Sequence, residues 1–177
     1  EGDYRENTGL YDSEEFLSAI GEEADFGNYT TACKLRYMED RDFYRAAADG
    51  GIIEWAPEEY VWVISTKGGG ETVFSLTDGG TWEMSSYRGP ISSGRTGDTV
   101  NMDIVNQAVI DLSGGTESIA DVPAVCVSAF HTNFVCFVSG GEEYFVPFGS
   151  RPDLTGLVNG QVYMAQKLVE ALDAAYS

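Results

Sequence analysis

The sequence predicts an α+β fold in which antiparallel sheet is covered by about three helices. Three observations lead to this prediction. β-Prone runs occur as hairpins around glycine-rich turns, amphipathic stretches of helical period separate them, and hydrophobic residues make up 43% of the chain. A chain of 177 residues buries roughly 70% of its unfolded surface, so we expect one sizeable core.

The first half is expected to contain one helix followed by strands. Residues 1–12 are polar and turn-rich, which predicts a flexible lead-in to a single domain over 13–177. Asp12 followed by Glu15 matches a capping box at the start of a helix. The elements expected, in chain order, are a helix over 12–24, a strand over 29–38, a short helix over 42–49, and strands over 60–66, 71–76 and 81–86.

The second half repeats this pattern and ends with a helix. Residues 87–100 contain the Gly, Pro and Ser of a long loop, and Asn101 is a candidate helix cap after it. The C-terminal helix is expected to bury Met164, Leu168 and Leu172. The elements expected, in chain order, are a helix over 101–112, strands over 123–130, 134–139 and 143–148, and a helix over 160–175.

The two hairpins resemble each other in sequence. VWVIS, GGE and VF within residues 61–74 parallel VCFVS, GGE and YF within 135–145, and each hairpin follows a helix and a Cys-bearing strand. One interpretation is an α-β-β-β unit used twice, in halves 13–86 and 101–177. The alternative is a chance similarity between Gly-Gly turns, and both interpretations predict an α+β fold.

Charge excludes several functions. The 29 acidic and 10 basic residues give a net charge of −19, so we expect no nucleic-acid binding and no attachment to anionic lipid through a basic patch. No apolar run reaches the 18 or so residues of a membrane span. Low Lys content, abundant Tyr and Gly, and a pI near 4.1 favour an extracytoplasmic bacterial protein. We expect it to be secreted or an envelope lipoprotein, with a signal segment that this chain lacks.

The three cysteines leave two interpretations open. Cys33, Cys126 and Cys136 lie among apolar or β-prone neighbours, as buried thiols do. A single Cys126–Cys136 or Cys33–Cys126 disulfide is the alternative. Zinc is not expected, because the chain has no C-x₂-C pair and only one histidine.

No motif predicts catalysis, a metal or a cofactor. His131, the only imidazole, lies in an expected turn, and no G-x-S-x-G motif is present. Adjacent glutamates such as Glu58 and Glu59 point to opposite faces if they lie on a strand, so we interpret them as surface residues. Neither an EF-hand loop nor a nucleotide-binding glycine motif occurs.

Aromatic residues are the strongest indication of a binding site. Residues 55–87 interleave aromatic side chains with glutamates, an arrangement that suits stacking on sugars or contact with a cationic peptide. Trp62 lies on a strand that is apolar on both sides and is expected in the core. The candidates for ligand binding are Trp55, Tyr60, Trp82 and Tyr87.

These observations predict a non-enzymatic binding domain whose partner is a protein, a peptide or a glycan. The alternative is a hydrolase that acts on an envelope polysaccharide or peptide through long-range carboxylates or His131. Residues 26–100 carry a net charge of −4, with eleven acids and seven bases, and are the least acidic part of the chain. We therefore expect a partner to bind to this middle segment.

Overall fold

The computed structural model describes residues 6–20, 29–66, 71–88 and 100–176. In this part of the chain, six α-helices, one 3₁₀-helix and one eight-stranded sheet form an α+β fold, which confirms the predicted class but not the expected number of about three helices. The helices are α1 (Ser13–Ile20), α2 (Asp40–Asp49), α3 (Ile52–Trp55), α4 (Met102–Leu112), the 3₁₀-helix η1 (Ile119–Asp121), α5 (Pro152–Thr155) and α6 (Ala165–Tyr176). The strands are β1 (Tyr29–Tyr37), β2 (Val61–Thr66), β3 (Glu71–Leu76), β4 (Trp82–Arg88), β5 (Ala124–Ala129), β6 (Thr132–Ser139), β7 (Glu142–Phe148) and β8 (Tyr163–Met164).

The sheet consists of two antiparallel meanders that meet at one parallel pair. Its strand order is β4-β3-β2-β1-β5-β6-β7-β8, and β1 and β5 run parallel through a short register that includes Leu35 opposite Cys126. The sheet is therefore mixed, and the prediction of antiparallel pairing is wrong at this junction. Hairpin patterns report only pairing between neighbouring segments, whereas β1 and β5 lie far apart in the chain.

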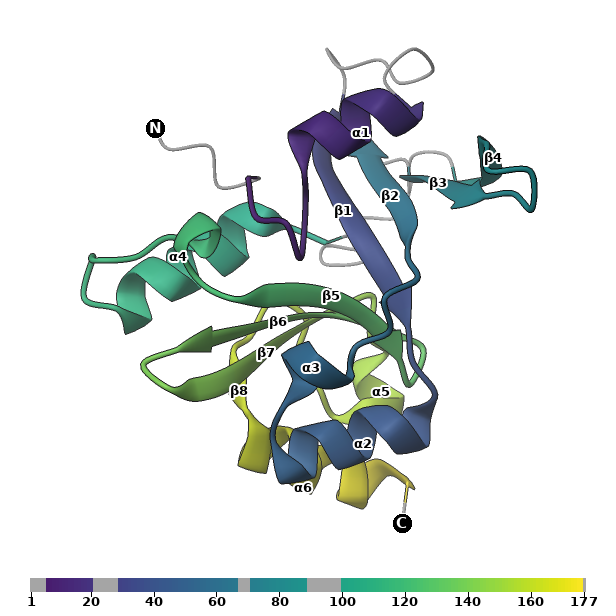
Figure 1. Ribbon diagram of the computed structural model, residues 1–177. Coiled ribbons are helices and arrows are strands. Elements are labelled where there is room, and N and C mark those ends of the chain that lie inside the picture. The colour runs from purple at the N-terminus through teal and green to yellow at the C-terminus, as the bar shows by residue number, and fades with distance from the viewer. Residues whose placement is uncertain (1–5, 21–28, 67–70, 89–99, 177) are drawn as a thin grey trace.

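Helices cover both faces of the second meander (Figure 1). On one face, Val105 and Val109 of α4 belong to a buried cluster that contains Phe137. On the other face, α2 and α6 contribute Phe43 and Leu168 to a second cluster. Burial from both sides explains why β6 is apolar on both of its faces.

Part of the segment expected as a flexible lead-in is packed against the sheet. Leu10 is buried, and its carbonyl accepts a hydrogen bond of 2.7 Å from the backbone N–H of Lys34 in β1. The buried Asn7 side chain donates from Nδ2 to the carbonyls of Ile119 (2.8 Å) and Val122 (2.6 Å). Residues 7–11 thus link β1 to the chain that leads into β5.

Two helix caps agree with the sequence analysis. The Asp12 carboxylate accepts from the Glu15 N–H at 2.9 Å, and the Asn101 side chain accepts from the Asp103 N–H at 3.1 Å. The end of the helix expected over 12–24 lies outside the described residues. The four-residue helices α3 and α5 were not expected, because so few residues show no helical period.

The last helix begins later than expected. Residues 163–164 pair with β7 as the short strand β8, so α6 starts at Ala165. Leu168 and Leu172 are buried as predicted, whereas Met164 lies on β8 and is exposed. In the expected 87–100 loop, Tyr87 is instead part of β4, and residues 89–99 lie outside the described residues.

The three cysteines are buried and form no disulfide, which confirms the interpretation as buried thiols. In the described parts of the chain, no helix has the length and apolar character needed to cross a bilayer.

Candidate functional site

A groove of about 670 Å³ lies where the end of β1, the segment before β2 and the β3–β4 turn meet. Its volume is in the range of pockets that enclose small ligands. Aromatic rings and carboxylates line it together, and the carboxylate side chains belong to exposed residues. The charged and aromatic residues that line the groove are Tyr37, Glu58, Glu59, Tyr60, Asp78 and Trp82.

A stacked aromatic pair forms part of the groove wall. The ring centroids of Tyr60 and Trp82 are 5.7 Å apart, with 29° between the ring planes. Tyr60 also contacts the fully buried Trp62 edge-on, at 5.7 Å and 87°. The stack is therefore fixed to the core, which holds Trp82 in place at the groove.

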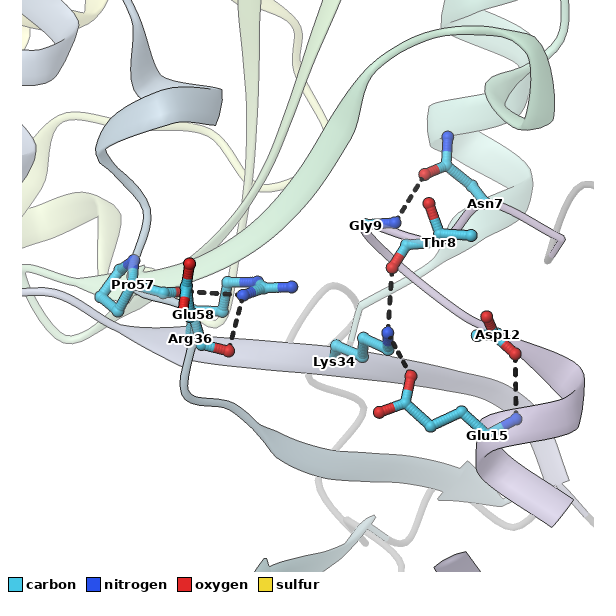
Figure 2. Close-up of polar contacts among 9 residues, drawn as sticks. All are labelled: Asn7, Thr8, Gly9, Asp12, Glu15, Lys34, Arg36, Pro57 and Glu58. Atoms are coloured by element: carbon cyan, nitrogen blue, oxygen red, sulfur yellow. Dashed lines mark hydrogen bonds and ion pairs between the residues drawn. The ribbon is translucent and has the colours of Figure 1, made fainter. Parts of the chain in front are cut away.

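Two cations from β1 lie over the Tyr60 ring. Lys34 Nζ is 4.9 Å from the ring centroid, and Arg36 Cζ is 5.4 Å from it. Lys34 is buried, and it forms an ion pair with Glu15 (2.6 Å) and donates to the Thr8 carbonyl (3.0 Å), as Figure 2 shows. The tyrosine ring thus already has cationic partners within the chain.

Arg36 fixes one rim of the groove (Figure 2). Its Nη1 donates to the carbonyls of Pro57 (2.6 Å) and Glu58 (2.9 Å), which immediately precede Glu59 and Tyr60. Partial burial lowers the pKa of Arg36, while the charges of Glu15 and Glu58 act in the opposite direction. An arginine remains charged near neutral pH in either case, so both bonds are charge-assisted.

The opposite rim is a closed turn between β3 and β4. Thr77 N–H donates to the Thr81 carbonyl at 2.8 Å, and Thr81 N–H donates to Thr77 Oγ1 at 3.1 Å. Gly80 has a φ of 82°, a conformation that favours glycine. Because this turn is tied at both ends, it presents Asp78 to the groove from a fixed backbone.

The structure brings together two of the four aromatic residues that the sequence analysis selected. Tyr60 and Trp82 line the groove and stack on each other. Trp55 is exposed on α3 but does not line this groove. The side chain of Tyr87 lies outside the described residues. Trp62 is in the core, as predicted.

Most other residues of the groove were not predicted from the sequence, among them Tyr37, Leu76 and Asp78. Tyr37 and Leu76 are 60% and 55% exposed at the ends of β1 and β3. A large apolar residue at the point where a strand meets a turn could have indicated an exposed surface. Asp78 lies in a Thr-Asp-Gly-Gly sequence, which by itself indicates only a turn.

Nucleophile–base chemistry finds no support at His131. The imidazole is exposed in the two-residue β5–β6 turn, where His131 and Phe130 both have positive φ. Cys126 and Cys136 are buried in β5 and β6, and burial raises the pKa of Cys136 well above its ordinary value. A buried, protonated thiol is a poor nucleophile. Among the described residues, no three His, Cys, Asp or Glu side chains are grouped to hold a metal ion.

Comparisons of this chain with protein-family models, with curated proteins and with solved structures find no match.

Proposed function

We propose that this chain is a non-enzymatic binding domain and that the groove beside Trp82 is its ligand site. The observation that carries the proposal is the Tyr60–Trp82 stack, at 5.7 Å, within a groove of about 670 Å³. Aromatic faces anchored to a core supply contact area at little cost in conformational entropy. Both rims are tied by hydrogen bonds, so binding requires little ordering of the site.

The binding function is favoured over the alternative of a hydrolase. A carboxylic general acid is commonly kept protonated at neutral pH by burial in apolar surroundings. Glu58, Glu59 and Asp78 are instead exposed at the groove. Exposed carboxylates beside aromatic rings suit the recognition of a ligand better than proton transfer.

An extracytoplasmic location, as a secreted or lipid-anchored bacterial envelope protein, is also part of the proposal. Its support is compositional: a pI near 4.1 and only three lysines in 177 residues. Protease treatment of intact cells that express the natural gene tests it. A secreted protein is found in the medium, and an envelope protein is degraded in intact cells or after selective opening of the outer membrane, whereas protection until the cytoplasmic membrane is lysed would contradict the location.

A repeated α-β-β-β unit is the finer proposal for the architecture. Each meander follows a helix, and the similar hairpins occupy equivalent positions, β2–β3 in one half and β6–β7 in the other. The α2 and α3 helices between β1 and β2 would then be an insertion into the first unit.

Parallel binding to a peptide array and a glycan array tests the proposed function. The wild-type protein, Trp82→Ala and the control Trp55→Ala are compared at equal concentration, after circular dichroism confirms that each is folded. Trp55 is a suitable control because it is exposed but lies outside the groove. We expect wild type and Trp55→Ala to bind the same probes and Trp82→Ala to lose them. Equal binding by all three proteins, or no bound probe on either array, would contradict a ligand site at Trp82.

A further inference from the structure

We infer that the ligand of the groove is a basic peptide segment, which brings a Lys or Arg side chain against Trp82 and the rim carboxylates. This inference rests on the proposed binding function and specifies its ligand class. It follows from the charge of the lining, from a contact that the chain makes internally, and from the exposed apolar residues beside the carboxylates.

The charge of the lining favours a cation. Glu58, Glu59 and Asp78 reach the groove from its two rims, and no Lys or Arg is among the described residues that line it. Like charges gathered in a groove create a negative potential that raises the local concentration of cations. The neutral hydroxyl groups of a sugar would not reduce the repulsion among these carboxylates, whereas a basic side chain would reduce it.

The aromatic wall has the chemistry to hold that cation. Inside the protein, Lys34 Nζ lies 4.9 Å from the Tyr60 centroid and Arg36 Cζ lies 5.4 Å from it. Trp82 stacks on Tyr60 and lines the groove, and indole is the best aromatic partner for an ammonium or guanidinium group. A ligand cation over the Trp82 ring would therefore form the same kind of cation–π contact that Lys34 forms with the Tyr60 ring.

Exposed apolar side chains complete the match to a basic residue. Tyr37 and Leu76 line the groove and are more than half exposed. Lys and Arg have long aliphatic stems that pack on apolar surface while their charged ends contact carboxylates. A small inorganic cation would use the carboxylates but would leave these apolar residues unused.

Fluorescence titration with matched peptides tests the inference. The probes are the blocked pentapeptide Gly-Lys-Gly-Arg-Gly, the same peptide with acetyl-lysine and citrulline in place of Lys and Arg, and neutral chitotetraose. The proteins are wild type, Trp82→Ala, the double variant Glu58→Gln/Asp78→Asn, and the control Glu83→Gln. Glu83 follows Trp82 in β4 and is exposed, but it does not line the groove.

We expect only the basic peptide to bind. Relative to wild type, the affinity for this peptide should fall at least tenfold in the double variant and in Trp82→Ala, and it should stay within twofold in Glu83→Gln. The affinity should also weaken as salt rises from 0.05 to 0.5 M, because salt screens exposed charges. Binding of Trp82→Ala is followed by calorimetry, since that variant lacks the indole reporter.

The outcomes separate this inference from the proposed function. Trp82-dependent binding of chitotetraose or of the neutral peptide would overturn the basic-peptide inference while supporting a ligand site in the groove. Self-association of the wild type that is lost in Trp82→Ala would assign the groove to a second copy of the chain and also overturn it. An equal loss of affinity in Glu83→Gln and in the double variant would show a general charge effect, which contradicts a site at the rim carboxylates. If no probe binds to any protein, the inference is wrong, and the arrays decide separately whether the groove binds another ligand.

Discussion

Lys34 and Glu15 form an ion pair that joins the sheet to α1. The distance from Lys34 Nζ to Glu15 Oε2 is 2.6 Å, and the side chains are 7% and 40% exposed, respectively. The same ammonium donates to the Thr8 carbonyl at 3.0 Å and lies over the Tyr60 ring. Lys34 thus connects the N-terminal segment and α1, as Figure 2 shows, and it also contacts the Tyr60 ring in the wall of the groove.

Removing the Glu15 carboxylate should destabilise the protein more than removing a neighbouring charge. Glu15→Ala leaves the buried Lys34 ammonium without its anion, and we expect the free energy of unfolding to fall by about 2 kcal/mol, since the pair is partly screened at Glu15. The control Glu14→Ala removes an exposed charge from the same helix and should change it by less than about 0.5 kcal/mol. Urea unfolding followed by circular dichroism measures both. Equal effects of the two substitutions would show that the ion pair contributes nothing beyond surface charge.

Gly9 packs against the backbone of Ala124 at the start of β5. A Cβ at this position would clash with the Ala124 carbonyl oxygen, and no backbone adjustment of a few tenths of an ångström relieves that clash. We therefore expect Gly9→Ala to lower the free energy of unfolding by about 3 kcal/mol. Gly79→Ala is the matched control, because its nearest neighbour would be Thr77 Oγ1 at 3.8 Å. If thermal unfolding shows the same midpoint for the two variants, residues 7–11 do not pack against β5 as described.

The sequence predicted the elements whose signals are local. Alternating and helical periods identified the long helices and most strands, and Asn101 was correctly expected to cap α4. Trp62 was correctly placed in the core because its strand is apolar on both sides. These features depend on neighbouring residues in the chain, so a single sequence contains the information that determines them.

The features that the sequence did not predict depend on distant contacts. The parallel β1–β5 pair and the hydrogen bond from Asn7 to Ile119 each join segments that lie far apart along the chain, 112 residues in the case of Asn7 and Ile119. The groove has the same origin, because Tyr60 precedes β2 whereas Trp82 begins β4. Aromatic enrichment indicated that a site exists in the middle of the chain, but it could not show that Asp78 belongs to that site and that Trp55 does not.

Burial of the thiols predicts both their reactivity and a loss of stability at high pH. Cys33, Cys126 and Cys136 should be unreactive toward a thiol reagent in the native protein and all react after unfolding in guanidinium chloride.

Burial, assisted by the charge of Glu143, raises the pKa of Cys136 well above its ordinary value of 9.0. The unfolded chain therefore loses this proton first, and the free energy of unfolding should fall as pH rises beyond about 9.

Cys136→Ala provides the control for this pH dependence. The variant should lose part of its stability at neutral pH, where a cavity replaces the thiol, and it should show a shallower decline in alkaline solution. Rapid modification of Cys136 in the native protein would contradict its burial. If the free energy of unfolding of Cys136→Ala falls with pH in alkaline solution as steeply as that of the wild type, groups other than Cys136 cause the fall.

Asp121 is expected to titrate at an unusually low pH. The Ser118 backbone N–H donates to its Oδ2 at 2.8 Å and the Ser118 hydroxyl donates at 3.0 Å, and these bonds lower the pKa of Asp121 below its ordinary value of 3.8. A carboxyl whose pKa is lower in the folded state stabilises the protein above its unfolded pKa, and this contribution is lost as pH falls through the folded value. Carboxyl chemical shifts measured by NMR between pH 2 and 6 should give a midpoint below 3.8 for Asp121.

Removing the Ser118 hydroxyl should reverse part of this shift. Ser118→Ala deletes one of the two donors but keeps the backbone N–H, which contributes most, so the pKa of Asp121 should rise without reaching its ordinary value. Thr116→Ala is the matched control, because its hydroxyl donates to the Ser113 carbonyl and not to Asp121. If Asp121 titrates at or above 3.8 in the wild type, the cap at the start of η1 is absent in solution. The same conclusion follows if Thr116→Ala shifts the titration midpoint of Asp121 as far as Ser118→Ala does.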